Sequence, residues 1–379
     1  MAIRYTRGVL ARWFALVALS ACGRIGFEGV GGGAGDAGAD VTIADGAGDD
    51  ALPAPPGFVV SRTQLTTFTG FSWVALDVDW ARSLAYVGTR ETGHCVAVVD
   101  FANEAAPAIV RWIGDPASVC LEVALLDPGR LAVISSTASS VALWSLGADP
   151  RRDAPVLLDE HAGIDGPRHF SIDRSGAAPR LLIASTYGLV EYQVGAGALA
   201  FINSWPGDKC SGPYQIAVAT GAQIVVGCQA DNSAIEILER VGYAPVTALQ
   251  NMGPGVTGSW NATTLADGRA VVLGWANVVV RDVAAVTRWQ TTAGYRHAVA
   301  VAVDADTVWT ATEEGAIEVL SLATDGVARV IGRSSLGTGR DAYALRLAPS
   351  GRRGIAVTNR GHFVVFDPAQ IAPSDVVYR

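Results

Sequence analysis

A short apolar segment recurs seven times along the chain, and its spacing limits the folds that the chain can adopt. The copies are LAYVG at Leu84, LAVIS at Leu131, LLIAS at Leu181, IVVG after Gln223, AVVLG at Ala270, VWTAT after Thr307 and GIAVT after Arg353. They lie on average about 45 residues apart, at the upper end of the period of repeats that fold into four-stranded propeller blades. No stretch carries a long apolar pattern of period 3.6, so we expect strands rather than helices.

Each copy is the second of four predicted strands. In the clearest unit, Val74 to Ile113, an apolar strand is followed by a tight turn, a second strand, a loop, a third strand that ends near Asp, a turn with Pro, and a fourth strand. The third strands follow in the same phase throughout, as CVAVVD, VALWSL, LVEYQV, AIEILE, VVVRDV, AIEVLS and HFVVF. Four strands in each of seven units predict an all-β fold, a seven-bladed β-propeller of four-stranded antiparallel blades. A count of six or eight blades stays open, because boundaries are the least certain feature of a sequence pattern.

The two ends of the repeat region predict how the propeller is completed. After the seventh third strand, only the apolar run VVYR, Val376 to Arg379, remains. The run FVVSRTQLTTF, Phe58 to Phe68, belongs to no complete unit. We therefore expect this N-terminal strand to join the last blade, which removes an open sheet edge.

Two stretches of the repeat region resemble known propeller families. LAYVGTRETGHCVAVVDFANEAAPAIVRWI, from Leu84, is similar to the LVIVD-type repeats of bacterial surface propellers. GPRHFSIDRSGAAPRLLIAS, from Gly166, is similar to blades of the YVTN and lactonase-type seven-bladed propellers. The resemblance covers about residues 58–379. Its motifs describe blade geometry rather than chemistry, so it implies the fold.

The N-terminus has the features of an export signal. Arg4, Arg7 and Arg12 precede an apolar run, 13–18, that is far shorter than the roughly 20 residues needed to span a bilayer. LSAC, ending at Cys22, resembles the lipobox of bacterial lipoproteins, which implies cleavage before Cys22 and acylation of that residue. Several acyl chains anchor a protein more stably than one chain does. The alternative is an ordinary signal peptide with a chance cysteine.

The segment after Cys22 predicts a tether. Residues 26–56 are mainly Gly, Ala, Asp and Pro, with several acidic residues and no basic one. Such a segment cannot bury a core, and its like charges keep it extended. The expected organisation is a lipoprotein signal peptide over 1–21, the lipidated Cys22 with a disordered tether over 22–57, and the β-propeller over 58–379.

Charge and location together limit the partners. The net charge is −8 and there is no cluster of basic residues. Phosphate contacts supply most nucleic-acid affinity, so nucleic acid is excluded as a partner. The expected partners are the membrane, through the lipid anchor, and a protein or glycan of the cell envelope. Gly23 stands where many inner-membrane lipoproteins carry aspartate, which favours the outer membrane, on its periplasmic or surface side.

Four cysteines besides Cys22 are expected to form disulfides in an oxidising compartment. The loop between the second and third strands of a blade lies on the same face as the connections between blades. Cys95 and Cys228 lie at the first kind of loop, and Cys120 and Cys210 at the second. Of the three possible connectivities, this placement favours Cys95 with Cys120 and Cys210 with Cys228. Four free, buried cysteines are the alternative.

The candidate site lies at the predicted mouth of the central channel, where the blade-linking connections enter the innermost strands. Two Arg-His pairs, 168–169 and 296–297, are predicted to face each other across the propeller, with aromatic residues between them. The candidate residues at these positions are Trp73, Arg168, His169, Tyr214, Gln215, Trp260, Asn261, Arg296, His297, Asp341 and Tyr343. They predict a pocket for an anion or a sugar, with histidine available as a base. The alternative is that these side chains only fill the centre and bond the backbone there.

Neither a metal site nor a cofactor is expected. The five histidines lack ligand spacing, there is no Cys-x-x-Cys, and no phosphate-binding loop precedes a helix. No serine elbow is present either. Two functions stay open. The first is a non-enzymatic binding or interaction scaffold at the cell envelope. The second is a lactonase-like or other hydrolytic propeller that uses Arg168, His169, Arg296 and His297.

Overall fold

The computed structural model describes residues 56–65, 73–89, 95–115, 118–207, 214–220, 223–228, 234–239, 242, 250–251, 259–265, 269–274, 277–281, 286–290, 301–302, 307–312, 314–322, 328–337, 342–358 and 360–378. The predicted signal peptide, Cys22 and the tether up to residue 55 lie outside these ranges. Among the described residues, no helix is long and apolar enough to cross a membrane.

The described strands form seven antiparallel sheets, which we number as blades 1 to 7 in the order of their innermost strands. Blade 1 consists of β2 (Trp73–Asp79), β3 (Leu84–Thr89), β4 (Val96–Asp100) and β5 (Ala108–Ile113). Blade 2 consists of β6 (Cys120–Asp127), β7 (Arg130–Ser135), β8 (Ser140–Ser145) and β9 (Val156–Ala162). Blade 3 consists of β10 (His169–Asp173), β11 (Arg180–Ser185), β12 (Gly188–Val194) and β13 (Leu199–Pro206).

The remaining blades follow the same plan, except that blade 6 has a fifth strand. Blade 4 consists of β14 (Tyr214–Thr220), β15 (Gln223–Cys228), β16 (Ala234–Glu239) and β17 (Gln250–Asn251). Blade 5 consists of β18 (Ser259–Thr264), β19 (Ala270–Gly274), β20 (Asn277–Arg281) and β21 (Val286–Gln290). Blade 6 consists of β22 (Val301–Ala302), β23 (Thr307–Ala311), β24 (Ala316–Leu322), β25 (Ala328–Ser335) and β29 (Pro373–Tyr378). Blade 7 consists of β26 (Ala342–Leu347), β27 (Gly354–Thr358), β28 (His362–Phe366) and β1 (Val59–Gln64).

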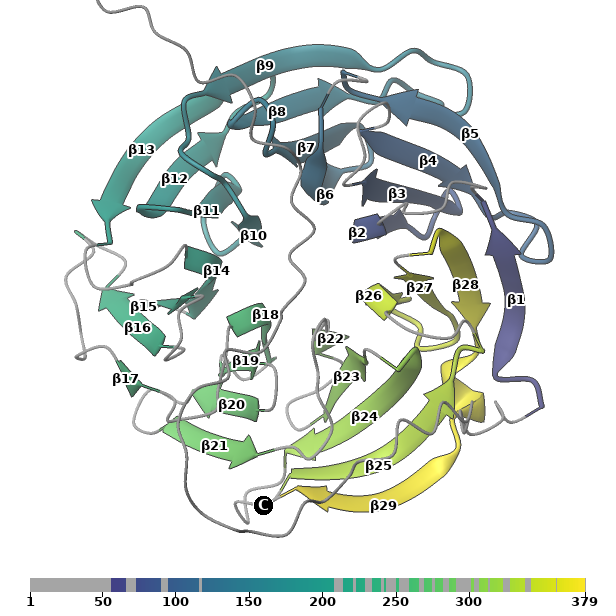
Figure 1. The fold of residues 1–379 in the computed structure, drawn as a ribbon. Helices are drawn as coiled ribbons and strands as arrows, with labels where there is room; N and C mark the ends of the chain where they lie inside the picture. Colours follow the sequence, from purple (N-terminus) through teal and green to yellow (C-terminus); the bar gives the residue numbers. More distant parts are fainter. Residues whose placement is uncertain are drawn as a thin grey trace, which may run out of the picture. The chain divides into compact units, whose positions relative to one another are not determined.

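The blades are arranged in a circular order. The innermost strands β2, β6, β10, β14, β18, β22 and β26 contact one another in this sequence, and β26 also contacts β2. Figure 1 shows these strands around the centre, with the outermost strands at the periphery. The predicted seven-bladed β-propeller is therefore confirmed.

The recurring apolar segments are the second and third strands of the blades, as predicted. Where their side chains are described, these strands are almost entirely buried, for example throughout β3 and β27. Strands that are covered on both faces have continuous apolar runs instead of alternating ones. Because each blade packs between two others, the same kind of run recurs once in every blade.

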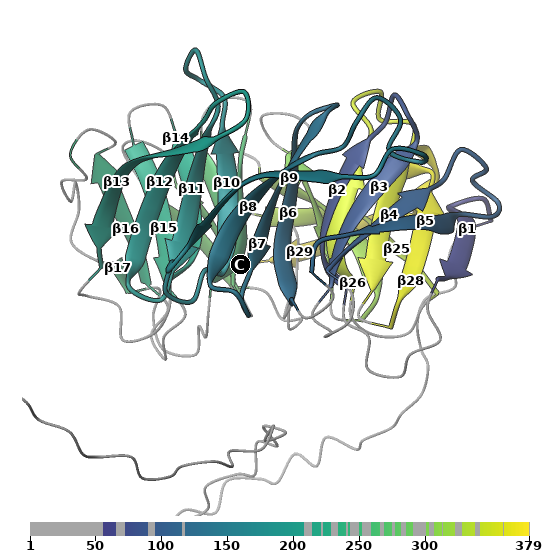
Figure 2. The ribbon, with the colours of Figure 1, turned by 90° about the horizontal axis from the view of Figure 1, so that it is seen from above.

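The N-terminal strand completes blade 7, as predicted. β1 pairs antiparallel with β28, and Figure 2 shows it at the outer edge of that blade. Phe58, just before β1, is fully buried, and its ring centroid lies 5.3 Å from that of Phe366. Trp309 of blade 6 belongs to the same core cluster, and its ring stacks with that of Phe366 at a centroid distance of 6.4 Å. The segment that precedes the repeats therefore contributes to the core between blades.

The C-terminus differs from the prediction of four strands in every blade. β29 pairs antiparallel with β25 and makes blade 6 a five-stranded sheet. The short 3-10 helix η1 (Pro368–Gln370) turns the chain from β28 toward β25, and the Asp367 side chain caps it by accepting from the Ala369 N–H. Ile371 then packs where a side chain on Gly332 would lie. Two apolar residues near a chain end are too short a pattern to predict a strand.

One of the two predicted disulfides is present. Cys95 and Cys120 are bonded, with their Cα atoms 5.0 Å apart, and both are buried. The bond joins the segment before β4 to the start of β6, so it links blades 1 and 2. Cys210 lies outside the described residues, and the side chain of Cys228 is not described, so the second pair stays a prediction.

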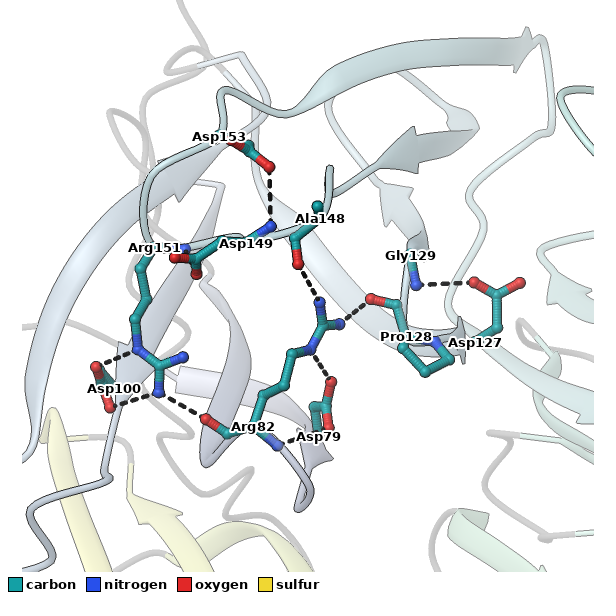
Figure 3. Close-up of polar contacts among 10 residues, drawn as sticks. All are labelled: Asp79, Arg82, Asp100, Asp127, Pro128, Gly129, Ala148, Asp149, Arg151 and Asp153. Atoms are coloured by element: carbon teal, nitrogen blue, oxygen red, sulfur yellow. Dashed lines mark hydrogen bonds and ion pairs between the residues drawn. The ribbon is translucent and has the colours of Figure 1, made fainter.

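Arginine side chains connect blades 1 and 2 at the other ends of the strands (Figure 3). Arg82, in the β2–β3 turn, pairs with the buried Asp79 and donates to the carbonyl oxygen of Pro128. Arg151 of blade 2 pairs with Asp100 at the end of β4 and donates to the Arg82 carbonyl oxygen at 2.6 Å. The hydrogen bonds from Arg151 lower the pKa of the Asp100 carboxyl. The two blades are thus fixed to each other by a disulfide at one end and by charge-assisted hydrogen bonds at the other.

Candidate functional site

Four ionisable side chains lie on the innermost strands of four consecutive blades. They are Arg346 on β26, Asp77 on β2, Glu122 on β6 and His169 on β10. We call these four residues the inner-strand polar cluster. Figure 1 shows their strands side by side at the centre of the propeller.

Asp77 connects three of these strands. Its Oδ1 lies 3.5 Å from Nε of Arg346, and its Oδ2 accepts a hydrogen bond from the backbone N–H of Leu125 at 2.6 Å. Its Oδ1 also accepts from the N–H of Val78. Both oxygens of Asp77 are therefore bonded, and the Arg346–Asp77 pair carries no net charge.

Glu122 and His169 form the second pair. Oε2 of Glu122 lies 3.6 Å from Nε2 of His169, and each side chain is 15% exposed. Burial raises the pKa of Glu122 to about 8, against the opposing attraction of Arg346. Burial, together with the positive charge of Arg346, lowers the pKa of His169 to about 4. Both groups are therefore uncharged at neutral pH, and the Glu122 carboxyl holds a proton beside the imidazole.

On β10, His169 and Ser171 each have a side-chain polar atom with no hydrogen-bond partner within the described part of the chain. These atoms are Nδ1 of His169 and Oγ of Ser171, and both are buried. His169 and Ser171 are two residues apart on β10, so their side chains lie on the same face of the strand. A buried polar atom without a partner costs about 1–3 kcal/mol, and in native proteins most buried polar atoms bond to protein or to ordered water.

A β-bulge recurs at the second residue of the innermost strands. The ladder register shifts there in β2, β6, β14, β18 and β26. The residues at these bulges are Val74, Leu121, Gln215, Trp260 and Tyr343. Bulges redirect side chains and are common beside functional sites. Three of the predicted site residues, Gln215, Trp260 and Tyr343, thus lie at bulges where the chain enters a blade.

The structure brings His169 into the cluster and describes two more predicted residues. Arg168 is exposed next to His169, and its backbone N–H donates a hydrogen bond to the carbonyl oxygen of Ala184 at 2.9 Å. Tyr343 is half-buried on β26.

The side chains of the other predicted site residues are not described. Trp73, Tyr214, Gln215, Trp260 and Asn261 lie on β2, β14 and β18, where their side chains are not described. Arg296, His297 and Asp341 lie outside the described residues, so the facing of the two Arg-His pairs stays a prediction.

The sequence prediction missed Asp77, Glu122, Ser171 and Arg346. The predicted site residues lie where the chain enters the innermost strands, whereas these four residues lie farther along the strands. A usable signal was present, because a charged residue interrupts otherwise apolar runs in VALDVDW, LEVALL and YALRLA. Within a strand that packs at the centre of a fold, a charged residue requires a partner.

Glu122→Gln is expected to remove a pH dependence of stability. Between about 4.5 and about 8 the folded chain holds the Glu122 proton that the unfolded chain releases, so the free energy of unfolding falls as the pH rises. His169 acts in the opposite sense between about 4 and 6.5, where the unfolded chain binds the extra proton. From pH 6.5 to 8 only the Glu122 effect remains, at up to about 1.4 kcal/mol per pH unit.

The measurement is urea unfolding at pH 6.5 and pH 8.0. From pH 6.5 to pH 8.0, the free energy of unfolding of wild type is expected to fall by on the order of 1–2 kcal/mol more than that of Glu122→Gln. Glu239→Gln, at an exposed glutamate on β16, is the matched control and should follow wild type. Equal losses in wild type and Glu122→Gln would show that Glu122 is ionised in the folded protein at neutral pH.

Comparison with known proteins shows similarity of structure alone. No protein-family model and no curated protein sequence matches the chain. Three similar solved structures come from Sqt1 of Saccharomyces cerevisiae, the mitotic checkpoint complex, and virginiamycin B lyase of Staphylococcus aureus. The first is 11% identical and covers 82% of this chain and 99% of its own, with a TM-score of 0.61.

The other two structures are similarly distant from this chain in sequence. The chain from the mitotic checkpoint complex is 12% identical and covers 82% of this chain and 94% of its own, with a TM-score of 0.62. The lyase is 8% identical and covers 80% of this chain and 98% of its own, with a TM-score of 0.62. At these identities the likeness is one of fold. Together with the seven sheets and their circular contacts, it identifies the chain as a β-propeller.

Proposed function

We propose that this chain is an exported, lipid-anchored binding protein whose propeller binds a glycan of the cell envelope at the inner-strand polar cluster. The observation that carries the proposal is a pair of buried, unpartnered polar atoms: Nδ1 of His169, in a cluster that has no net charge, and Oγ of Ser171, two residues farther along β10 on the same face.

The charge balance of the cluster favours a neutral ligand rich in hydroxyl groups. The charges of Arg346 and Asp77 compensate each other, and burial keeps Glu122 and His169 uncharged. An anion would therefore find no excess positive charge at the cluster. A sugar hydroxyl both donates and accepts, so it could bond to the imidazole nitrogen and to the Ser171 hydroxyl. Of the two ligand classes that the sequence predicts, sugar fits this cluster better than anion.

The anchor is supported by the sequence around Cys22. Arginines and a short apolar run precede LSAC, and an acidic, glycine-rich segment follows it. Acylation of Cys22 would hold the protein at the membrane, and the segment over 22–57 would keep the propeller at a distance from it.

Cys22→Ser is expected to move the exported protein from the membrane fraction to the soluble fraction, because serine cannot accept the thioether-linked lipid. The measurement is fractionation of cells that express each variant, followed by immunodetection. Cys210→Ser, which leaves Cys22 intact, is the matched control and should stay with the membrane. Retention of Cys22→Ser in the membrane fraction after export would contradict the anchor.

The binding site is tested by thermal shift with neutral saccharides. The probes are glucose, galactose, mannose and N-acetylglucosamine, with their disaccharides and trisaccharides. A ligand at 100 times its Kd stabilises the folded state by about 2.7 kcal/mol, and Arg346→Met and Ser171→Val should lose most of that shift. Arg352→Met, at an exposed arginine of the same blade, should keep it. A shift that survives in Arg346→Met and Ser171→Val would place the ligand elsewhere.

A hydrolytic enzyme is the second candidate, and the Glu122–His169 pair is the observation that favours it. A carboxyl whose pKa is raised to about 8 can act as a general acid near neutral pH. Turnover of lactones or sugar esters that disappears in both His169→Ala and Glu122→Gln would favour catalysis. A saccharide-dependent thermal shift without turnover would favour binding.

A further inference from the structure

The fourth strands of five blades, counted from the centre, share one exposed feature. In each, a β-bulge places a single aliphatic residue that is 37–46% exposed. These residues are Val60 on β1, Val110 on β5, Leu158 on β9, Ile202 on β13 and Ile331 on β25. Bulges at sheet edges increase the local twist and hinder pairing with another chain.

Four of these five outer strands have an additional protection against pairing. β25 is covered by β29. β1 carries Arg62, β5 carries Arg111, and β9 carries the adjacent acids Asp159 and Glu160. Charged residues on edge strands are a common device that discourages edge-to-edge association.

β13 carries no charge of its own, and only its first residue is covered: the Leu199 N–H donates to Oδ2 of Asp159 on β9 at 2.7 Å. Its eight residues, LAFINSWP, include no charged side chain, and in the described part of the chain it pairs only with β12. Phe201 is 56% exposed and Ile202 is 38% exposed. Tyr187, whose carbonyl oxygen accepts from the Gly207 N–H just beyond β13, is 64% exposed. An uncharged edge with exposed apolar side chains is the kind of strand that pairs with another strand.

β25 shows that an outer strand of this geometry accepts a further antiparallel strand. β25 and β13 are both eight residues long. Both have the bulge at the fourth residue, Ile331 in one and Ile202 in the other. In blade 6 this bulge does not prevent β29 from pairing with β25. The corresponding edge of blade 3 is therefore geometrically able to pair as well.

We infer that β13 pairs antiparallel with β13 of a second copy of this chain, across a twofold axis near Ile202. A strand without charge can face itself with no like charges opposed, which a strand such as β9 cannot. The bulge lies near the middle of β13, so a twofold axis there brings Phe201 and Ile202 of both copies into the interface. The pairing is independent of the proposed glycan site.

The test is the molar mass of the full chain carrying Cys22→Ser, measured by light scattering from 1 to about 100 µM, a range in which standard-sized interfaces are populated. The parent protein is expected to be a dimer. Ile202→Lys adds a charge at the exposed bulge and should halve the mass, while its melting temperature stays near that of the parent. Val110→Lys, at the equivalent bulge of β5, is the matched control and should remain dimeric.

Three results would overturn the pairing. One is a parent protein that is monomeric over the whole concentration range. Another is an Ile202→Lys variant that keeps the dimer mass. The third is equal dissociation of Ile202→Lys and Val110→Lys, which would indicate a general effect of added charge.

Discussion

A chain that begins at Trp73 is expected to unfold at a much lower temperature than the full chain and to lose most of its solubility. The deletion removes β1, so β28 becomes an exposed edge strand, and it removes Phe58 from the core between blades. Deleting a fully buried aromatic side chain alone costs about 3–5 kcal/mol. The lost strand pairing adds to this cost, and the apolar edge left on β28 favours aggregation.

Point substitutions separate the effect of losing the buried Phe58 side chain from the effect of losing the pairing of β1. Phe58→Ala is expected to lower the free energy of unfolding by about 3–5 kcal/mol. Val60→Ala, at the exposed bulge of the same strand, should change it by less than about 0.5 kcal/mol. The measurement is urea unfolding of the full-length variants. If the chain that begins at Trp73 stays soluble, keeps the oligomeric state of the full chain and melts like it, β1 does not complete blade 7.

Replacement of both Cys95 and Cys120 by alanine is expected to lower the free energy of unfolding by about 3 kcal/mol. The two residues are 25 positions apart, and the chain-entropy model assigns roughly this value to a loop of that length. The bond also links blade 1 to blade 2, so its loss should make the opening of this boundary easier. The linking contacts of Arg82 and Arg151 at the other end of the strands remain in the variant.

The measurement is urea unfolding of the double variant and of the parent protein under oxidising and reducing conditions. Reduction should lower the free energy of unfolding of the parent and bring it closer to that of the double variant. Peptide mapping of the non-reduced parent should recover Cys95 joined to Cys120. A bridge from Cys95 to Cys210 would contradict the connectivity and the assignment of both loops to one face.

The fold could be predicted from the sequence because its information is local and repeated. An apolar run such as that of β3 is buried wherever it occurs, and seven copies at a regular spacing allow few architectures. The place of β1 could be predicted because its segment belongs to no complete repeat unit, while the last unit lacks a fourth strand. β29 was missed because its pairing with β25 depends on the turn at η1, which a local pattern does not determine.

The candidate site could be predicted only in part, because it combines residues from four blades. His169 was predicted from its place at the start of a blade. Its partner Glu122, and the pair formed by Asp77 and Arg346, depend on which face of each innermost strand points toward the neighbouring blade. A bulge changes that face by one residue, and a sequence pattern does not specify a bulge.

The most direct test of the account is a crystal structure of the full chain, carrying Cys22→Ser, with the neutral saccharide that gives the largest thermal shift. The account predicts sugar hydroxyls within hydrogen-bond distance of His169 Nδ1 and Ser171 Oγ, beside an intact Arg346–Asp77 pair. A saccharide bound only at the outer strands, or a cluster whose polar atoms bond to one another and exclude the ligand, would contradict it.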